Sequence, residues 1–164
     1  MKRTARGRLY LLLGVAALFA LALWQWRRDA RDAPGTLLAL DPAAITQVTL
    51  QLGDAPATHY AKRDGHWWRD DGQRADDRYV ETLAAAAAAP VLQWRAGADF
   101  DAAKIGLEPP HAVLSLDGQR LAFGAMSATG PQCYVQAGAR VALVSLRYMP
   151  KAPQQDHVEL SGAH

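Results

Sequence analysis

The histidines are the first side chains to consider for metal or acid–base chemistry, and their spacing favours neither. No two of them stand in the HxH or HExxH spacing that places metal ligands on one face of an element. His59 and His66 can meet across a predicted hairpin, but the sequence supplies no third ligand beside them. We therefore predict no metal site, and we interpret the histidines as packed or solvated side chains: His59, His66, His111, His157 and His164.

Carboxylates gather in two regions of the chain. Asp70-Asp71 and Asp76-Asp77 form an acidic cluster, in which a calcium ion would need several oxygens to converge. Their positions suit other roles, because Asp70-Asp71 precede a glycine in a turn and Asp76 or Asp77 can cap a helix. A glycosidase needs two carboxyl groups at a set separation, and nothing in the sequence brings together those of the central loop: Asp99, Asp101 and Glu108.

The candidate nucleophiles lack the surroundings that would activate them. The stretch SATGP at residues 127–131 lacks the Gly-Lys-Ser/Thr ending of a phosphate loop, and no serine stands in a nucleophile elbow. Cys133 lies in the alternating stretch QCYVQ, which favours a small buried residue over a reactive thiol or an intermolecular disulfide. We predict no catalytic residue and no cofactor, so an envelope hydrolase is the least favoured function.

Aromatic side chains offer the remaining binding chemistry. Four of them could form an apolar shelf for a glycan or lipid, or a partner surface, if they shared one concavity. These four are Trp67, Trp68, Trp94 and Tyr134. The alternative is that they are ordinary core aromatics.

Residues 9–26, LYLLLGVAALFALALWQW, contain no charged side chain. In a helix they would extend about 27 Å, at about 1.5 Å per residue, which just crosses the bilayer core. Residues 1–8 form a basic tail with four Lys and Arg side chains, against three shortly after the segment. Basic flanks stay cytoplasmic, so we predict a single-pass anchor in the inner membrane, with a cytoplasmic N-terminus and a periplasmic domain.

A cleaved signal peptide is the rival interpretation of this segment. Ala20-Leu21-Ala22 matches the small-residue pattern of a cleavage site. Leu23, Trp24 and Trp26 continue the apolar run beyond that site, and tryptophan prefers the membrane interface. The sequence therefore favours a retained signal anchor.

The basic residues near the apolar segment dominate the charge of the whole chain. From residue 33 onward there are 11 basic and 14 acidic side chains, a net charge of about −3. No basic stripe with interleaved aromatic residues is present, so we predict no nucleic-acid partner.

Alternating apolar residues predict strands from residue 45 onward, separated by turn residues. Asp64-Gly65 and Asp117-Gly118 predict two-residue hairpins, and Gly138-Ala139 predicts a third. Asp76 or Asp77 begins a predicted helix over about 77–89, which Pro90 ends. We thus predict an α+β fold of mainly antiparallel sheet with one principal helix, divided as follows: a linker at 27–40, a domain at 41–149 and a loose tail at 150–164.

The first hairpin also predicts which tryptophan enters the core. A two-residue turn pairs Lys62 with Trp67 and Ala61 with Trp68. Because Ala61 is small and leaves room for a large ring opposite, we predict that Trp68 faces the core.

From about residue 45 to 144, the chain resembles an uncharacterised bacterial family, domain of unknown function 4340. The stretches that carry the resemblance are ITQVTLQL, DGHWW, IGLEPP, SLDGQRLAFG and YVQAGARVALV. The resemblance implies a membrane-anchored envelope protein, associated with gliding-motility-type components of ABC transporters, and it implies no catalytic residues. We therefore expect a non-enzymatic accessory or scaffold protein whose partner is a membrane protein, with a periplasmic ligand-binding module as the alternative.

Overall fold

The computed structural model describes the backbone of residues 3–32 and 34–153, and the side chains of residues 12–27 and 34–153. The chain divides into two compact units, one at Met1–Ala33 and one at Pro34–His164. The first unit contains α1, Arg3–Asp32. Within the described residues, no helix is both long enough and apolar enough to cross a membrane. The span expected at 9–26 begins at Leu9, and the side chains of residues 9–11 lie outside those described.

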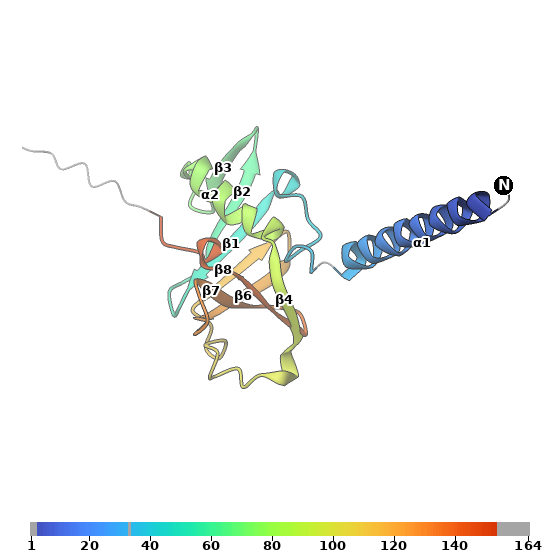
Figure 1. The fold of residues 1–164 in the computed structure, drawn as a ribbon. Coiled ribbons are helices and arrows are strands. Elements are labelled where there is room, and N and C mark those ends of the chain that lie inside the picture. The colour runs from blue at the N-terminus through green and yellow to red at the C-terminus, as the bar shows by residue number, and fades with distance from the viewer. Residues whose placement is uncertain (1–2, 33, 154–164) are drawn as a thin grey trace, which may run out of the picture. The chain divides into compact units, whose positions relative to one another are not determined.

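The second unit is an antiparallel sheet of eight strands, with α2 (Asp77–Ala84) against one face (Figure 1). In space the strand order is β3-β2-β1-β5-β6-β7-β8-β4. The predicted α+β class with mainly antiparallel sheet is therefore confirmed. The strands are β1 Gln47–Leu52, β2 Thr58–Arg63, β3 His66–Arg69, β4 Val91–Ala96, β5 Ala112–Leu116, β6 Gln119–Met126, β7 Gln132–Ala137 and β8 Arg140–Ser145.

Two of the hairpins have the backbone that their turn residues predict. Asp64 and Gly65 have φ values of 52° and 78°, and Asp117 and Gly118 have values of 46° and 84°. Positive φ at both central residues matches the right-handed twist of the flanking strands. The third predicted hairpin is also present, because β7 and β8 pair up to Ala137 and Arg140.

The principal helix begins as predicted but changes its form before it ends. The Asp76 carboxylate caps α2 by accepting hydrogen bonds from the backbone N–H groups of Arg78 at 2.9 Å and Tyr79 at 3.4 Å. The alanine run then tightens into the 3-10 helix η2, Ala85–Ala88. Four of its alanines are buried, because their small side chains allow a close approach to the sheet: Ala84, Ala86, Ala87 and Ala89.

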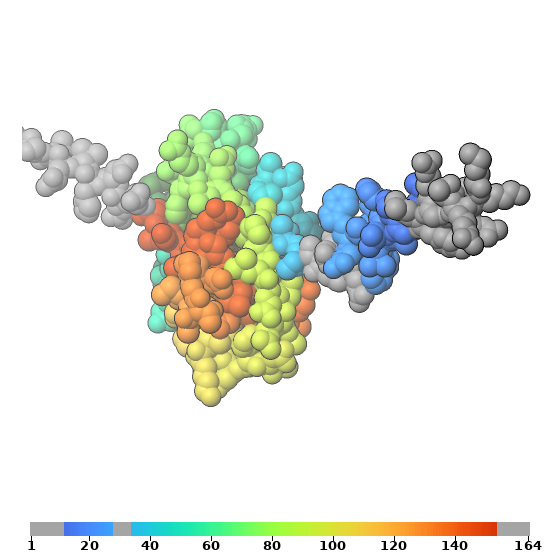
Figure 2. Space-filling view, in the orientation of Figure 1, coloured from blue at the N-terminus to red at the C-terminus, as the bar shows by residue number. Residues whose placement is uncertain are grey.

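The predicted linker at 27–40 is divided between the two units, because α1 continues to Asp32 and the second unit starts at Pro34. Leu37 donates a backbone hydrogen bond to Ala89 at 3.1 Å, and Leu38 donates one to Ala87 at 3.0 Å. Both leucines are buried, and Figure 2 shows their segment in cyan against the yellow-green chain of η2 and β4. Pro34 to Leu40 is therefore part of the domain. The tail expected to be loose, residues 150–164, lies outside the described residues from 154 onward.

The prediction that Trp68 faces the core is wrong. The predicted pairing of Lys62 with Trp67 and of Ala61 with Trp68 is present, but Trp67 is the buried ring, with 1% of its surface exposed. Tyr60 pairs with Val48, so Tyr60, Lys62 and Trp67 share the face that α2 covers. The faces of this hairpin are thus decided by its pairing with β1, and the small size of Ala61 is irrelevant because Ala61 points to the other face.

A smaller apolar cluster covers the other face of the sheet. The loop between β4 and β5 places Leu107 against Ala122 and Val141, and Phe100 packs edge-on against Tyr134 with ring centroids 5.6 Å apart. This loop approaches β6 closely because Gly124 has no side chain there: an added Cβ would lie 2.4 Å from the Ile105 carbonyl oxygen. The sheet is therefore covered on both faces over part of its area.

Candidate functional site

The four aromatic residues proposed as a shelf do not come together. Trp67 and Trp94 lie on the inner face, but on β3 and β4, which are the two edges of the sheet. By strand alternation, Trp68 and Tyr134 lie on the outer face, on β3 and β7. Trp94 is the one member of the set that lines a described pocket.

The histidines and carboxylates make local contacts in the described part of the chain. His59 contacts Thr49 at 2.9 Å rather than His66, and Asp71 pairs with Arg69 at 2.9 Å within its own turn. Among the described residues, no three or more His, Cys, Asp or Glu side chains could hold a metal ion. His157 and His164 lie outside the described residues.

The candidate nucleophiles are held in ordinary packing. Ser127 is nearly buried and shares a hydrogen bond of 2.9 Å with the Thr129 hydroxyl, inside one loop. Cys133 is fully buried, as the strand pattern predicts, and burial raises the pKa of its thiol to about 11. A thiol in that environment stays protonated near neutral pH and is a poor nucleophile.

Asp77 joins the start of α2 to the first hairpin. Its Oδ1 accepts a hydrogen bond from the Trp67 backbone N–H at 2.7 Å, and its Oδ2 lies 2.8 Å from His66 Nδ1 and 3.3 Å from the Arg74 guanidinium. Arg74 also approaches His66 Nδ1 at 2.7 Å, and that nitrogen donates to Asp77 only when it carries a proton. The hydrogen bond from His66, followed by that from Trp67, lowers the pKa of Asp77 to about 2.

These contacts of the Asp77 carboxylate predict a specific loss of stability in acid. The pKa of Asp77 falls from its ordinary 3.8 to about 2 on folding, so the stabilisation is complete above about pH 4 and disappears as the pH falls toward 2. In Asp77→Asn, the denaturation midpoint should be lower than in the wild type at pH 6, and the difference should shrink by pH 2. Urea titrations at several pH values measure this.

The control for the acid prediction is Asp54→Asn. Asp54 is exposed in a turn and makes no hydrogen bond or ion pair among the described residues. Its replacement should leave the denaturation midpoint unchanged across the same pH range. A midpoint difference for Asp77→Asn that stays constant from pH 6 to pH 2 would mean that the carboxylate charge contributes nothing.

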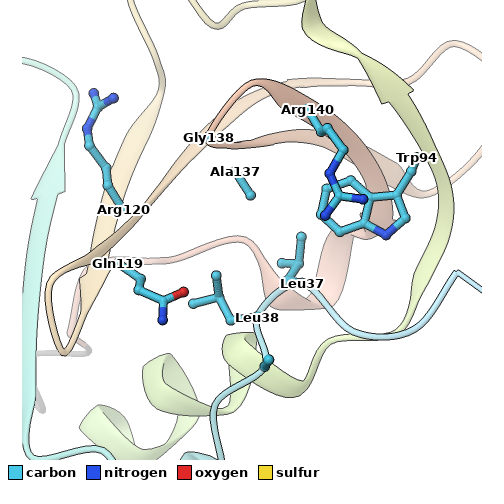
Figure 3. A pocket seen from close by; sticks show the side chains of 9 residues that line it. Leu37, Leu38, Trp94, Gln119, Arg120, Ala137, Gly138 and Arg140 are labelled. Carbon is cyan, nitrogen blue, oxygen red and sulfur yellow. The ribbon is translucent and has the colours of Figure 1, made fainter.

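A pocket beside Trp94 is lined by charged, aromatic and apolar side chains. It has a volume of about 410 Å³ and opens where several strands end (Figure 3). In the order β6-β7-β8-β4, antiparallel pairing brings the start of β6, the end of β7 and the start of β8 to one end of the sheet. The lining residues are Leu37, Leu38, Ala39, Trp94, Gln119, Arg120, Ala137, Gly138 and Arg140.

Arg140 and Trp94 form a stacked pair at the side of this pocket. Arg140 pairs with Ala96, which makes it a diagonal neighbour of Trp94 on the same face. Its guanidinium carbon lies 4.2 Å from the centre of the Trp94 ring (Figure 3). The ring is held in turn by a hydrogen bond of 2.7 Å from its Nε1 to the Pro34 carbonyl.

The pocket is positively charged. Arg120 and Arg140 line it, no acidic residue does, and neither arginine forms an ion pair with another described residue. The nearest carboxylate along the chain is that of Asp117, which does not line the pocket and whose Oδ1 accepts hydrogen bonds from the backbone N–H groups of Thr46 at 3.1 Å and Gln47 at 2.9 Å. Sequence reasoning missed this site because Arg120 and Arg140 stand in separate hairpins.

No protein-family model matches the chain, and no match is found among the curated proteins or the solved structures.

Proposed function

We propose that this protein is a non-enzymatic accessory or scaffold protein of a bacterial envelope complex. Residues 9–26 anchor it in the inner membrane, residues 1–8 remain in the cytoplasm, and the domain lies in the periplasm. Its partner is a membrane protein. The choice of an ABC-type transporter component as that partner follows from the resemblance to domain of unknown function 4340 alone.

The observation that carries this proposal is the exposure of apolar side chains along α1. Leu18 is 70% exposed, Phe19 is 69% exposed and Trp26 is 73% exposed. Burial of apolar surface yields about 25 cal/mol per Å², so large apolar side chains exposed at successive positions of one helix favour contact with a membrane or another protein. Lipid or a membrane-embedded partner would supply the missing cover.

We expect the intact chain to stay with the membrane after an alkaline carbonate wash, and the double variant Leu18→Lys, Leu21→Lys to be released. A lysine at the centre of a membrane helix costs about 2.5–3.5 kcal/mol, so two should prevent insertion. The measurement is the fraction of protein in the membrane pellet.

The matched control is Leu92→Lys, because Leu92 is a 52% exposed leucine on the domain. This variant should remain in the membrane pellet. Release of the wild-type chain by carbonate, or a mature N-terminus at Leu23, would contradict the anchor. A reporter that is active only outside the cytoplasm, fused after His164, should be active if the orientation is right.

The scaffold role is tested by separating the effect of attaching the domain to the membrane from the effect of individual side chains. A chain in which an unrelated membrane helix replaces residues 9–26 should still complement a deletion strain, whereas a domain released by a cleavable signal should not, because confinement raises the effective concentration at a membrane partner. Alanine at His59, Asp71 or Ser127 should leave complementation intact. A folded variant of these three that fails to complement would favour an active site.

A periplasmic ligand-binding module remains the second candidate function. One observation favours it: the pocket beside Trp94 combines a stacked arginine with an aromatic ring and an apolar floor.

A further inference from the structure

We propose that the pocket beside Trp94 binds a phosphate group. This inference does not depend on the anchor or on a membrane partner, because every lining residue belongs to the unit that starts at Pro34. It identifies the chemistry of a ligand for the second candidate function.

The guanidinium of Arg140 has unpaired hydrogen-bond donors among the described residues. One face of its guanidinium lies on the Trp94 ring, 4.2 Å from the ring centre. Stacking restricts the group but leaves its edge free, and that edge carries the parallel N–H donors that fit two oxygens of one anion. Because Arg140 forms no ion pair with another described residue, those donors are available.

The rim of the pocket is polar. By strand alternation, Gln119 lies on the same face as Leu121 and Ala137, and Figure 3 shows its amide pointing across the pocket. Arg120 is the next residue and lies on the rim, with its side chain extending away from the centre in Figure 3. Gln119 therefore places an amide on the side of the pocket opposite Arg140, and Arg120 adds a more distant positive charge at the rim.

The charge of the lining favours phosphate over a carboxylate. The lining includes Arg140 and no acid, with Arg120 at the rim on the opposite face of β6. A phosphate monoester carries about −1.5 to −2 charges near neutral pH, against −1 for a carboxylate, and so gains more from Arg140 and from the more distant Arg120. The buried floor of Leu37 and Leu38 gives no charged partner for a cationic ligand. A phosphate monoester, free or attached to a small organic group, fits this lining best.

The test uses the full chain in a non-ionic maltoside detergent, which contains no phosphate. Inorganic phosphate is titrated at constant ionic strength while the indole N–H resonances of the tryptophans are followed by nuclear magnetic resonance. The Trp94 indole donates to the Pro34 carbonyl beside the pocket, so its resonance should shift saturably at millimolar phosphate. Sodium acetate should shift it less, and sodium chloride should not produce saturation.

Variants separate a phosphate site from a general salt effect. Arg140→Gln should weaken phosphate binding by about tenfold or more, because a charged hydrogen-bonded pair is worth about 1.5–3 kcal/mol, and Arg120→Gln should weaken it less. The matched control is Arg95→Gln: Arg95 lies 5.7 Å over the Phe100 ring on the outer face, so this variant should bind like the wild type.

Further measurements test the role of the Arg140 guanidinium and distinguish the sources of phosphate. Arg140→Lys retains the positive charge but lacks the two parallel N–H donors of the guanidinium. This variant should therefore fold and bind phosphate with intermediate affinity. A short-chain phosphatidic acid competing with inorganic phosphate would indicate a lipid headgroup, and competition by a sugar phosphate alone would indicate a soluble ligand. Absence of saturation in the wild type, or equal effects of Arg95→Gln and Arg140→Gln, would overturn the proposal.

Discussion

Replacing Trp67 with alanine should lower the free energy of unfolding by about 3–5 kcal/mol, the usual cost of removing a large buried side chain. The ring is 1% exposed and lies in the cluster with Tyr60 and Val80, between the first hairpin and α2. Its loss would leave a cavity where α2 begins. Chemical denaturation of the full chain in detergent, followed by near-ultraviolet circular dichroism, measures the change.

Two further variants serve as comparisons for Trp67→Ala. Trp68→Ala should cost much less, because Trp68 is only partly buried and lies on the other face of the same strand. Trp67→Phe should also cost less than Trp67→Ala: it keeps a ring and removes the Nε1–H group, which has no hydrogen-bond partner among the described residues. Equal small losses for Trp67→Ala and Trp68→Ala would mean that neither ring is in the core.

Replacing Gly124 with alanine should cost about 1–3 kcal/mol, the range for overpacking a closed site. The new Cβ would lie 2.4 Å from the Ile105 carbonyl oxygen and 3.1 Å from the Leu107 side chain. The oxygen belongs to backbone that already accepts a hydrogen bond from the Ala125 N–H at 2.7 Å, so the loop must move away from β6. The same denaturation assay measures the loss of stability.

Limited proteolysis provides a second measurement for Gly124→Ala, because displacement of residues 105–107 should expose the loop to cleavage. Gly130→Ala is the matched control, since the nearest atom to a Cβ there is the end of the Gln132 side chain at 3.9 Å. That variant should be neutral or slightly more stable, because alanine restricts the unfolded chain. Similar losses at both glycines would show that the contact between the loop and β6 contributes nothing.

The sequence was most informative where local chemistry decides the backbone. Asp64-Gly65 and Asp117-Gly118 have the positive φ values that a two-residue hairpin requires, and Asp76 caps the helix that was expected near it. These features depend on residues within one turn of each other. The pairing of Lys62 with Trp67 follows in the same way, because a two-residue turn determines the register of its hairpin.

Local chemistry was insufficient to predict which face of the sheet α2 covers and where the domain begins. The sequence placed Trp67 and Trp68 on opposite faces, but the pairing of Tyr60 with Val48 decided which face α2 covers. The segment at 34–40 was expected to belong to a linker, yet its backbone hydrogen bonds to Ala87 and Ala89 make it part of the domain. Both outcomes depend on residues more than ten positions away.

By itself, the sequence determined the antiparallel α+β class, the hairpin registers and the start of α2, because each follows from residue spacing within one element or turn. Only the tertiary structure decided that Trp67 is buried, that the four aromatic residues lie apart, and that Arg140 stacks on Trp94 at a pocket that Gln119 also lines. The physical reason is that binding chemistry depends on contacts between strand ends. Those contacts are determined by the spatial order β6-β7-β8-β4, which no local pattern encodes.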